Sequence, residues 1–291
     1  MAKTREIKKR IKAVANIRRI TKTMQMIATS KFARSQQRAE ATKPYTEGVF
    51  ELVQELASTA GNVNHPLIDG PGRLEEGAGE VVLILTSDRG LCGPYNGSVL
   101  RTAMGMLRAS EDPGRQVELV GKKGANFLRF NGVPVARHHT QFGDTVEFED
   151  VQRLAQDYID RFVAGRITGV RVIYMRYITV GRQSPETLQL LPLKPPAVEH
   201  AAGEMTAQYE FSPPAEELLG ALLPEAVKAT LFQCFNDAQV SEHIARMVAM
   251  KAATDNAGKM GKSLTRQYNR ARQAQITTEL TEIISGAAAL E

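Results

Sequence analysis

Apolar residues recur at helical spacing along the N-terminal part of the chain. They advance in steps of three or four positions, typical of one face of a helix with a period close to that of a coiled coil: Ile7, Ile11, Val14, Ile17, Ile20, Met24 and Ile27. The first 43 residues contain neither proline nor glycine, and Pro44 is the first breaker. We predict a helix over 1–58, which at about 1.5 Å per residue is too long for a small core to bury. It therefore needs a second long helix as a partner.

The C-terminal part of the chain supplies a matching pattern. Residues 225–257 lack proline and glycine, and Pro213, Pro214 and Pro224 stand where the first turns of a helix tolerate proline. Frequent alanine favours helix and permits close approach of two helices. We predict a helix over 213–291 that pairs with the first in an antiparallel coiled coil. The apolar residues that continue along this helix are Val227, Leu231, Phe235, Ala238, Ile244, Met247, Val248, Met260, Leu264, Tyr268, Ala271, Ile276, Leu280 and Ile283.

Short apolar runs and amphipathic stretches alternate between the two helices. Residues 59–80 are rich in glycine, proline and asparagine and are predicted to be a linker, as is the polar segment 194–212. Strands alternating with helices favour an open α/β sheet of the Rossmann-like kind over 81–193. The predicted strands are 81–86, 117–120, 170–180 and 188–193, and the predicted helices are 94–109, 122–130 and a segment around 151–162.

The charge is concentrated at the N-terminus. The chain carries a net charge of +5. Over the first 38 residues Glu6 is the one acid, against Lys3, Arg5, Lys8, Lys9, Arg10, Lys12, Arg18, Arg19, Lys22, Lys31, Arg34 and Arg38. Such a segment needs an acidic partner, which leaves open nucleic acid, anionic lipid or an acidic protein surface. Single-strand binders interleave aromatic residues with the basic ones, whereas here Phe32 is the one aromatic before Tyr45. A solvated or protein-facing basic surface is therefore favoured over nucleic-acid binding and over a transit peptide.

Few residues suggest chemistry. Cys92 and Cys234 form no CxxC pair, the five histidines have no metal-ligand spacing, and no apolar run reaches the ~18 residues of a membrane span. Ser87–Gly93 follows a predicted strand, where Cys92 could act as a nucleophile, but a structural turn is the favoured interpretation. Gly258–Ser263 imitates a phosphate-binding loop but lacks its first glycine and its preceding strand.

Four blocks of the sequence together resemble the gamma subunits of rotary ATP synthases. They lie in the first helix, in the turn after the first strand, and twice in the last helix. Their sequences are Ile20-Thr-Lys-Thr-Met-Gln-Met-Ile-Ala-Thr-Ser-Lys31, Ser87-Asp-Arg-Gly-Leu-Cys-Gly93, Ala245-Arg-Met-Val-Ala-Met-Lys-Ala-Ala-Thr-Asp-Asn256, and Ile276-Thr277-x-Glu279-x-x-Glu282 followed by Gly286-Ala287. The blocks span both ends and the centre, so the resemblance covers essentially the whole chain. Pro94 departs from the glycine or alanine of many relatives, which the start of a helix tolerates.

The resemblance implies a central shaft without a catalytic site or cofactor of its own. In this family the terminal helices form a coiled coil inside a ring of three alpha and three beta subunits. The α/β domain lies beside the epsilon subunit and the membrane rotor ring. Such a shaft couples proton flow through the membrane sector to ATP synthesis or hydrolysis in the ring. It neither spans the membrane nor binds nucleic acid.

The resemblance also implies particular contacts and a location. Residues that match positions where the shaft meets the ring are Lys22, Met24, Arg246, Arg272, Gln273, Thr277 and Glu279. The chain shows no cysteine-bearing insert of the chloroplast type and no convincing presequence, which favours a bacterial protein. We therefore expect it on the cytoplasmic face of the plasma membrane, as a peripheral part of the synthase.

Overall fold

The computed structural model describes residues 2–60, 65–109, 112–193 and 215–288 of the 291-residue chain. The chain divides into two compact units. Unit 1 consists of Met1–Ser30 and Arg246–Glu291, and unit 2 consists of Lys31–Ala245. The predicted linker 194–212 lies outside the described residues.

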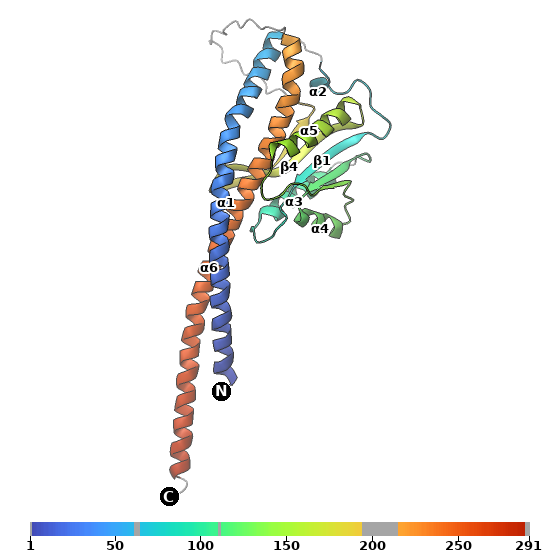
Figure 1. Ribbon diagram of the computed structural model, residues 1–291. Coiled ribbons are helices and arrows are strands. Elements are labelled where there is room, and N and C mark those ends of the chain that lie inside the picture. Colours follow the sequence, from blue (N-terminus) through green and yellow to red (C-terminus); the bar gives the residue numbers. More distant parts are fainter. Residues whose placement is uncertain (1, 61–64, 110–111, 194–214, 289–291) are drawn as a thin grey trace. The chain divides into compact units, whose positions relative to one another are not determined.

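Two long helices contribute to both units (Figure 1). Helix α1 spans Ala2–Ala60, with Pro44 inside it, and helix α6 spans Ala215–Ala288, with Pro224 inside it. Neither proline ends its helix, because the buried residues that flank it outweigh the roughly 3 kcal/mol that an internal proline costs. The predicted fold class, two long terminal helices and a central α/β sheet, is confirmed.

The two helices run antiparallel in unit 1. Thr254 Oγ1 of α6 donates a hydrogen bond to Thr21 Oγ1 of α1 at 2.8 Å, and Thr4 Oγ1 donates to Gln275 Oε1 at 3.2 Å. Residues later in α6 thus meet residues earlier in α1. The predicted antiparallel pairing is confirmed in this segment.

The seam of unit 1 follows a seven-residue repeat, with Arg18 as an exposed exception on α1. Its α1 positions are buried or half-buried at Ile7, Ile11, Val14, Thr21, Gln25 and Ala28. Its α6 positions are buried or half-buried at Met250, Thr254, Ala257, Gly261, Leu264, Tyr268, Ala271 and Gln275. Small residues at several of these positions let the two backbones approach, as in other close helix pairs. A Cβ added at Gly261 would lie 4.0 Å from a methyl group of Val14.

The predicted apolar stripe of α1 is wrong at Ile17, Ile20 and Ile27. The side chains of Ile17, Ile20 and Ile27 are 52%, 55% and 52% exposed. The steps between these residues are mostly of three positions, whereas the seam of a coiled coil needs an average of about 3.5. The isoleucines therefore rotate away from α6 and form a second, uncovered apolar stripe.

Unit 2 contains a five-stranded sheet with the order β3-β2-β1-β4-β5. All neighbouring strands are parallel except β5, which pairs antiparallel with β4. The strands are β1 Gly79–Leu85, β2 Gln116–Val120, β3 Arg137–His139, β4 Ile167–Thr179 and β5 Arg182–Leu191. Because the chain moves from β1 outward to β3 and then returns to β4, the carboxyl end of β1 lies at the topological switch point of the sheet.

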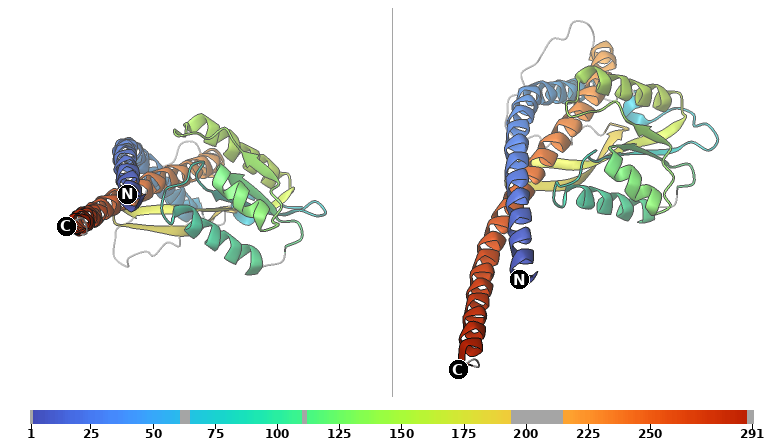
Figure 2. Two further views of the ribbon diagram at one scale, coloured as in Figure 1. Left: turned by 90° about the horizontal axis from the view of Figure 1, so that it is seen from below. Right: turned by 60° about the horizontal axis from the view of Figure 1, so that its bottom comes forward.

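Helices cover both faces of this sheet (Figure 2). One face packs on α5 (Phe148–Val163), on Leu219–Ala238 of α6 and on Val49–Leu56 of α1. The other packs on α3 (Tyr95–Ala109) and α4 (Lys122–Phe130). The short helix α2 is Pro66–Asp69. Burial of both faces explains the continuous apolar run of β1.

Two strands differ from the sequence prediction. β3 was not predicted, because its three residues include two histidines and an arginine and have no apolar alternation. β5 begins at Arg182 rather than at residue 188. Its first half is polar and includes Pro185, which an edge strand tolerates because one row of backbone groups there is unpaired.

A buried charge network crosses from β2 to β3 and α5. Glu118 of β2 is fully buried and accepts hydrogen bonds from Tyr158 Oη at 2.8 Å and Arg161 Nη1 at 2.8 Å, and it lies 2.7 Å from His139 Nε2. Arg161 Nη2 also donates to Gln116 Oε1 at 2.6 Å. Burial raises the pKa of Glu118, but hydrogen bonds with His139, Arg161 and Tyr158 outweigh it and lower that pKa to about 2. Glu118 therefore stays charged inside the protein.

Helix α6 is also the one helix in the described part of the chain that is long and apolar enough to meet a composition test for a membrane span, over Glu217–Ala287. Half of its most apolar stretch is buried inside the protein. Packing on the sheet of unit 2 and on α1 in unit 1 accounts for this apolar character.

Candidate functional site

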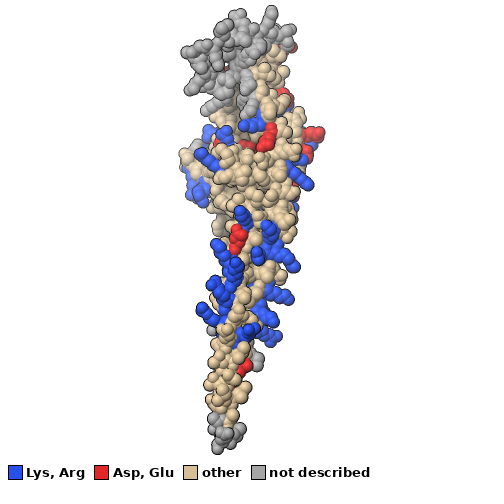
Figure 3. Space-filling view, turned by 90° about the vertical axis from the view of Figure 1, so that its left-hand side faces the viewer, with Lys and Arg blue, Asp and Glu red and all other residues tan. Residues whose placement is uncertain are grey.

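An open groove runs between α1 and α6 in unit 1. Its floor includes the seam residues Ile11, Val14 and Ala257. Asp255 is the one acidic residue in its lining, whereas the basic lining residues are Arg18, Arg19, Lys22, Lys251, Lys259, Lys262 and Arg266. We call this surface the basic groove. Figure 3 shows the Lys and Arg side chains gathered along the paired helices. Like charges held this close favour an acidic partner, which would relieve their repulsion.

Exposed apolar residues accompany the basic groove. On α1 they are the second stripe, Ile17, Ile20 and Ile27, together with Met26. On α6 every described residue from Ile276 to Gly286 is exposed, including Ile276, Leu280, Ile283 and Ile284 at 54–69%. Such a density of uncovered isoleucine and leucine is unusual for a free surface and indicates a protein partner. Unit 1 is thus a rod with basic and apolar contact surfaces.

Three of the predicted contact residues lie in the part of unit 1 that is nearest to unit 2 along the chain. Lys22 is exposed and lines the basic groove. Met24 and Arg246 are half-buried. Lys22 and Met24 lie close to Thr21, which marks the level of Thr254 on α6.

The other four predicted contact residues form a compact group on α6. Arg272, Gln273, Thr277 and Glu279 are all exposed. Thr277 Oγ1 donates to the Gln273 carbonyl at 3.0 Å, and Gln275 Nε2 donates to Glu279 Oε1 at 2.8 Å. The group therefore presents a carboxylate, an amide and a guanidinium within two turns of helix.

The seven predicted residues do not form a single site. Arg272 lies 18 positions beyond Thr254 along α6, which at 1.5 Å per residue is about 27 Å. The structure instead places them at two levels along unit 1. Sequence reasoning missed the apolar stripe of α1 as a contact surface. Counting in steps of seven from Ile7 and from Ile11 gives the positions that face α6, and Ile17, Ile20 and Ile27 are not among them. That count would have identified these isoleucines as a separate apolar stripe.

The turn after β1 is held together by its own side chains. Asn96 Oδ1 accepts a hydrogen bond from the Ser87 N–H at 3.0 Å, and Asn96 Nδ2 donates to Ser87 Oγ at 2.7 Å and to Cys92 Sγ at 3.2 Å. Cys92 is 2% exposed and packs in the apolar cluster with α3. This arrangement supports the structural interpretation of the turn over a nucleophilic Cys92.

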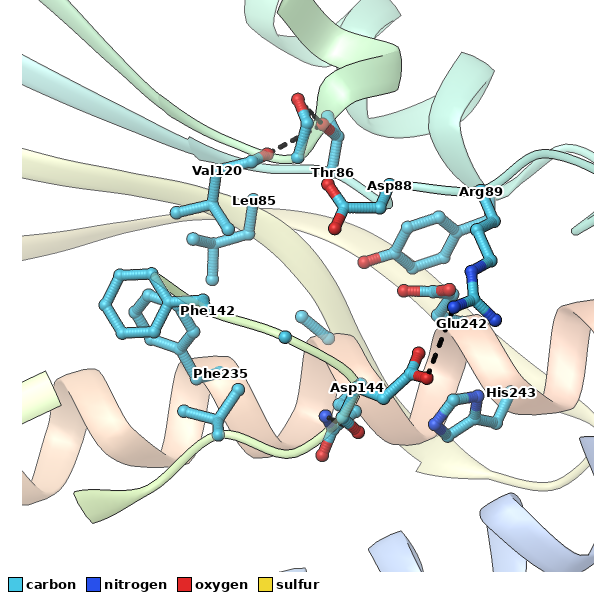
Figure 4. Close-up of a pocket in the computed structure, with 16 residues that line it drawn as sticks. Leu85, Thr86, Asp88, Arg89, Val120, Phe142, Asp144, Phe235, Glu242 and His243 are labelled. Atoms are coloured by element: carbon cyan, nitrogen blue, oxygen red, sulfur yellow. Dashed lines mark hydrogen bonds and ion pairs between the residues drawn. The ribbon is translucent and has the colours of Figure 1, made fainter. Parts of the chain in front are cut away.

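A small cavity lies beside this turn, at the switch point of the sheet (Figure 4). Leu85, Phe142 and Phe235 line its apolar end, and Arg89 and Asp144, which are 3.7 Å apart, line its polar end. Its volume is about 60 Å³. Pockets for nucleotide-sized ligands measure about 300–1,000 Å³. Side chains of α6 fill the crevice in which open α/β sheets usually bind their ligands.

The structure also bears on the phosphate-binding and metal-binding sites that the sequence analysis considered. Gly258–Ser263 lies within α6, so it is a helical segment and not a phosphate-binding loop. Among the described residues, no group of three or more His, Cys, Asp or Glu side chains is placed to hold a metal ion.

Comparisons with known proteins agree over the whole chain. The family model described as ATP synthase matches residues 3–290. The ATP synthase gamma chain of Rhodopirellula baltica is 40% identical over 298 residues and that of Methylibium petroleiphilum is 40% identical over 292 residues, each covering 100% of both chains. A chain of the Euglena gracilis mitochondrial ATP synthase, from the OSCP/F1/c-ring structure in rotational state 3, has the same fold, with a TM-score of 0.67, 17% identity and coverage of 99% and 95%. This chain therefore belongs to the ATP synthase gamma chain family.

Proposed function

We propose that this chain is the rotating central shaft of an ATP synthase, which couples proton flow through the membrane sector to ATP synthesis or hydrolysis. The observation that carries the proposal is the surface of unit 1, a two-helix rod whose sides and C-terminal end are basic or apolar and uncovered. A rod of this kind fits the bore of a ring, here one of three alpha and three beta subunits.

The rod is asymmetric, and the mechanism needs this asymmetry. One side carries the basic groove, another the stripe of Ile17, Ile20 and Ile27, and the end carries α6 alone. Each of three equivalent beta subunits would meet a different face with a different contact free energy. A third of a turn then exchanges their conformations, as linkage between binding and conformation requires.

The remaining assignments follow the same proposal. Solved structures with this fold include the central stalk and c-ring assembly of Tetrahymena thermophila mitochondrial ATP synthase. We propose that unit 2 contacts the epsilon subunit and the membrane rotor ring, on the cytoplasmic face of a bacterial plasma membrane. The functional parts would follow the predicted ranges: helix 1–58, linker 59–80, α/β domain 81–193, linker 194–212 and helix 213–291.

We also propose that the chain carries no catalytic group. Two contacts support this: α6 fills the switch-point crevice, and Cys92 is enclosed in its turn by Asn96 and Ser87. The free energy that the chain transmits would be converted at nucleotide sites in other subunits.

Purification of the tagged chain from its own host tests the function directly. We expect a complex of three alpha, three beta and one copy of this chain with ATPase activity, measured by native mass spectrometry and phosphate release. Recovery of the chain alone, or with nucleic acid whose binding is sensitive to salt, would instead support a polyanion-binding coiled coil. Loss of an activity of the isolated chain to a thiol reagent would support an enzyme that uses Cys92.

Glu279 is proposed to make a reversible polar contact with the ring. Glu279→Ala is expected to lower ATP synthesis in the assembled complex several-fold. Because Glu279 is exposed, the free energy of unfolding of the chain should change by less than about 0.5 kcal/mol. Glu282→Ala, which removes an exposed carboxylate three positions further along, is the control and should retain synthesis. Equal synthesis by wild type and Glu279→Ala would rule out this contact.

Met24 lies close to Thr21, at the level where Thr21 of α1 meets Thr254 of α6. An added positive charge there should increase the drag between the shaft and the ring. Met24→Lys is expected to lower the ratio of ATP synthesised to protons transported, because a new ion pair with an acidic beta loop must break at every step. Thr29→Lys adds the same charge to a different face of α1, at an exposed position outside the basic groove and the apolar stripe. If both variants lowered the ratio equally, net charge and not the position of Met24 would be responsible.

A further inference from the structure

A second hollow of unit 2 lies where α1 passes the segment before α5 and the middle of α6. It has a volume of about 150 Å³. Its lining includes Lys31, Arg34, Ser35 and Arg38 of α1, Asp144, and His243 of α6. We call it the Arg34 pocket. Neither the shaft mechanism nor the contacts with the ring use it.

The charges in the Arg34 pocket do not balance. Lys31 Nζ forms an ion pair with Asp144 Oδ2 at 2.7 Å, and this hydrogen bond holds the pKa of Asp144 below its usual range. Arg89 also lies 3.7 Å from the same carboxylate oxygen. Within the described residues, Arg34 and Arg38 form no ion pair with an acidic side chain. The positions of Lys31, Arg34 and Arg38 place them on one face of α1, so two uncompensated guanidinium groups face the same hollow.

The floor of the Arg34 pocket is polar as well as buried. Ser35, Gln239 and His243 are 8%, 9% and 3% exposed. Gln239 Nε2 donates to the Asp144 carbonyl at 2.6 Å, which fixes that wall of the pocket. The Ser35 hydroxyl makes no hydrogen bond to any described residue, although its side chain lines the hollow. The hydroxyl is open to the hollow, so it can donate a hydrogen bond to a ligand bound there.

We propose that the Arg34 pocket binds a tetrahedral oxyanion of the phosphate class. Guanidinium groups present paired N–H donors that match the oxygens of such an ion, and a serine hydroxyl adds a further donor. The volume admits one oxyanion with its waters, whereas nucleotide-sized ligands need about 300–1,000 Å³. Asp144 lowers the affinity of the pocket for the oxyanion, because its carboxylate repels the anion and forms an ion pair with Lys31.

Equilibrium dialysis of the purified full chain against radiolabelled inorganic phosphate, at constant ionic strength in chloride, tests the proposal. We expect one saturable site per chain. Arg34→Gln and Arg38→Gln should each bind phosphate about ten-fold more weakly, the loss of a charge-assisted pair of hydrogen bonds. Arg101→Gln removes a guanidinium of α3 that is also exposed but does not line the pocket, and it should leave binding unchanged.

Asp144→Asn gives the sharper test, because the expected effect has the opposite sign. Removing this carboxylate frees Lys31 and should tighten phosphate binding several-fold, whereas a general loss of structure would weaken it. Circular dichroism and thermal unfolding without phosphate would show that each variant is folded. Absence of a saturable site, or equal weakening by Arg101→Gln, would overturn the proposal. So would Arg34-dependent binding of a polyglutamate peptide that phosphate does not displace, since the pocket would then recognise an acidic protein.

Discussion

Replacing Glu118 by glutamine is expected to lower the free energy of unfolding of the chain by about 3–5 kcal/mol. The amide fills the same space but leaves Arg161, which is 7% exposed, without the carboxylate at 2.8 Å. Tyr158 and His139 would also lose a charged acceptor. Denaturant unfolding followed by circular dichroism measures the change.

Asp150→Asn is the matched control for Glu118→Gln. It removes the carboxylate that pairs with Arg153 on the solvent side of α5, where the arginine side chain is 76% exposed. An exposed pair within one helix contributes about 0.3–0.5 kcal/mol, so this variant should remain close to wild type. Similar losses of unfolding free energy in the two variants would show that the buried network contributes no more to stability than an exposed ion pair.

The Glu118 network also predicts a dependence of stability on pH. The pKa of Glu118 falls from its ordinary value of 4.5 to about 2 in the folded protein. Between these values the unfolded chain binds the proton and the folded chain does not, so stability rises with pH. The contribution is complete above the unfolded pKa and is lost as the pH falls through about 2. The acid-side slope should therefore be shallower in Glu118→Gln. An unchanged slope would contradict the depressed pKa.

Gly121→Ala is expected to be comparably damaging, at about 3–5 kcal/mol, through strain combined with a clash against the backbone. Gly121 has a φ of +95°, a conformation that side chains rarely adopt. An added Cβ would lie 2.3 Å from the Thr86 carbonyl oxygen. Thr86 cannot move aside, because its N–H and hydroxyl both donate to the Val120 carbonyl, at 2.9 and 2.7 Å. Thermal and denaturant unfolding of the full chain measure the loss.

Gly132→Ala is the control that separates the cost of backbone strain from the cost of the steric clash. Gly132 also has a positive φ, +71°, but an added Cβ would meet nothing within 4 Å. It should cost only the conformational strain of about 1–2 kcal/mol. A Gly121→Ala variant no less stable than Gly132→Ala would show that the end of β2 can shift away from β1.

Much of the fold could be predicted from local patterns. The apolar run at 81–86 and the helix at 122–130 are recognisable because apolar periodicity and glycine positions act over a few residues. The short strand β3 and the first half of β5 could not be predicted in this way. Both lie at edges of the sheet, where pairing with a neighbour stabilises polar residues that have no strand pattern of their own.

The contact residues stay a prediction, and the structure adds only where they lie. The resemblance placed Lys22 and Glu279 among contact residues, but only the structure separates them into two levels on the rod. The Arg34 pocket had no sequence signal. Arg34 and Asp144 are more than 100 residues apart in the chain, and nothing in either local pattern indicates that they share a hollow.

The sequence by itself determined the two long helices, the α/β character of the centre and the family. The absence of proline and glycine, the periodicity of apolar residues and the four matching blocks are all properties of the chain read in order. Only the tertiary structure decided which face of α1 is covered. Val14 is buried while Ile17 is exposed, although both continue the same apolar stripe. The physical reason is that a helix buries the residues that its partner reaches, and that choice depends on the register of α6 against α1 and not on hydrophobicity alone.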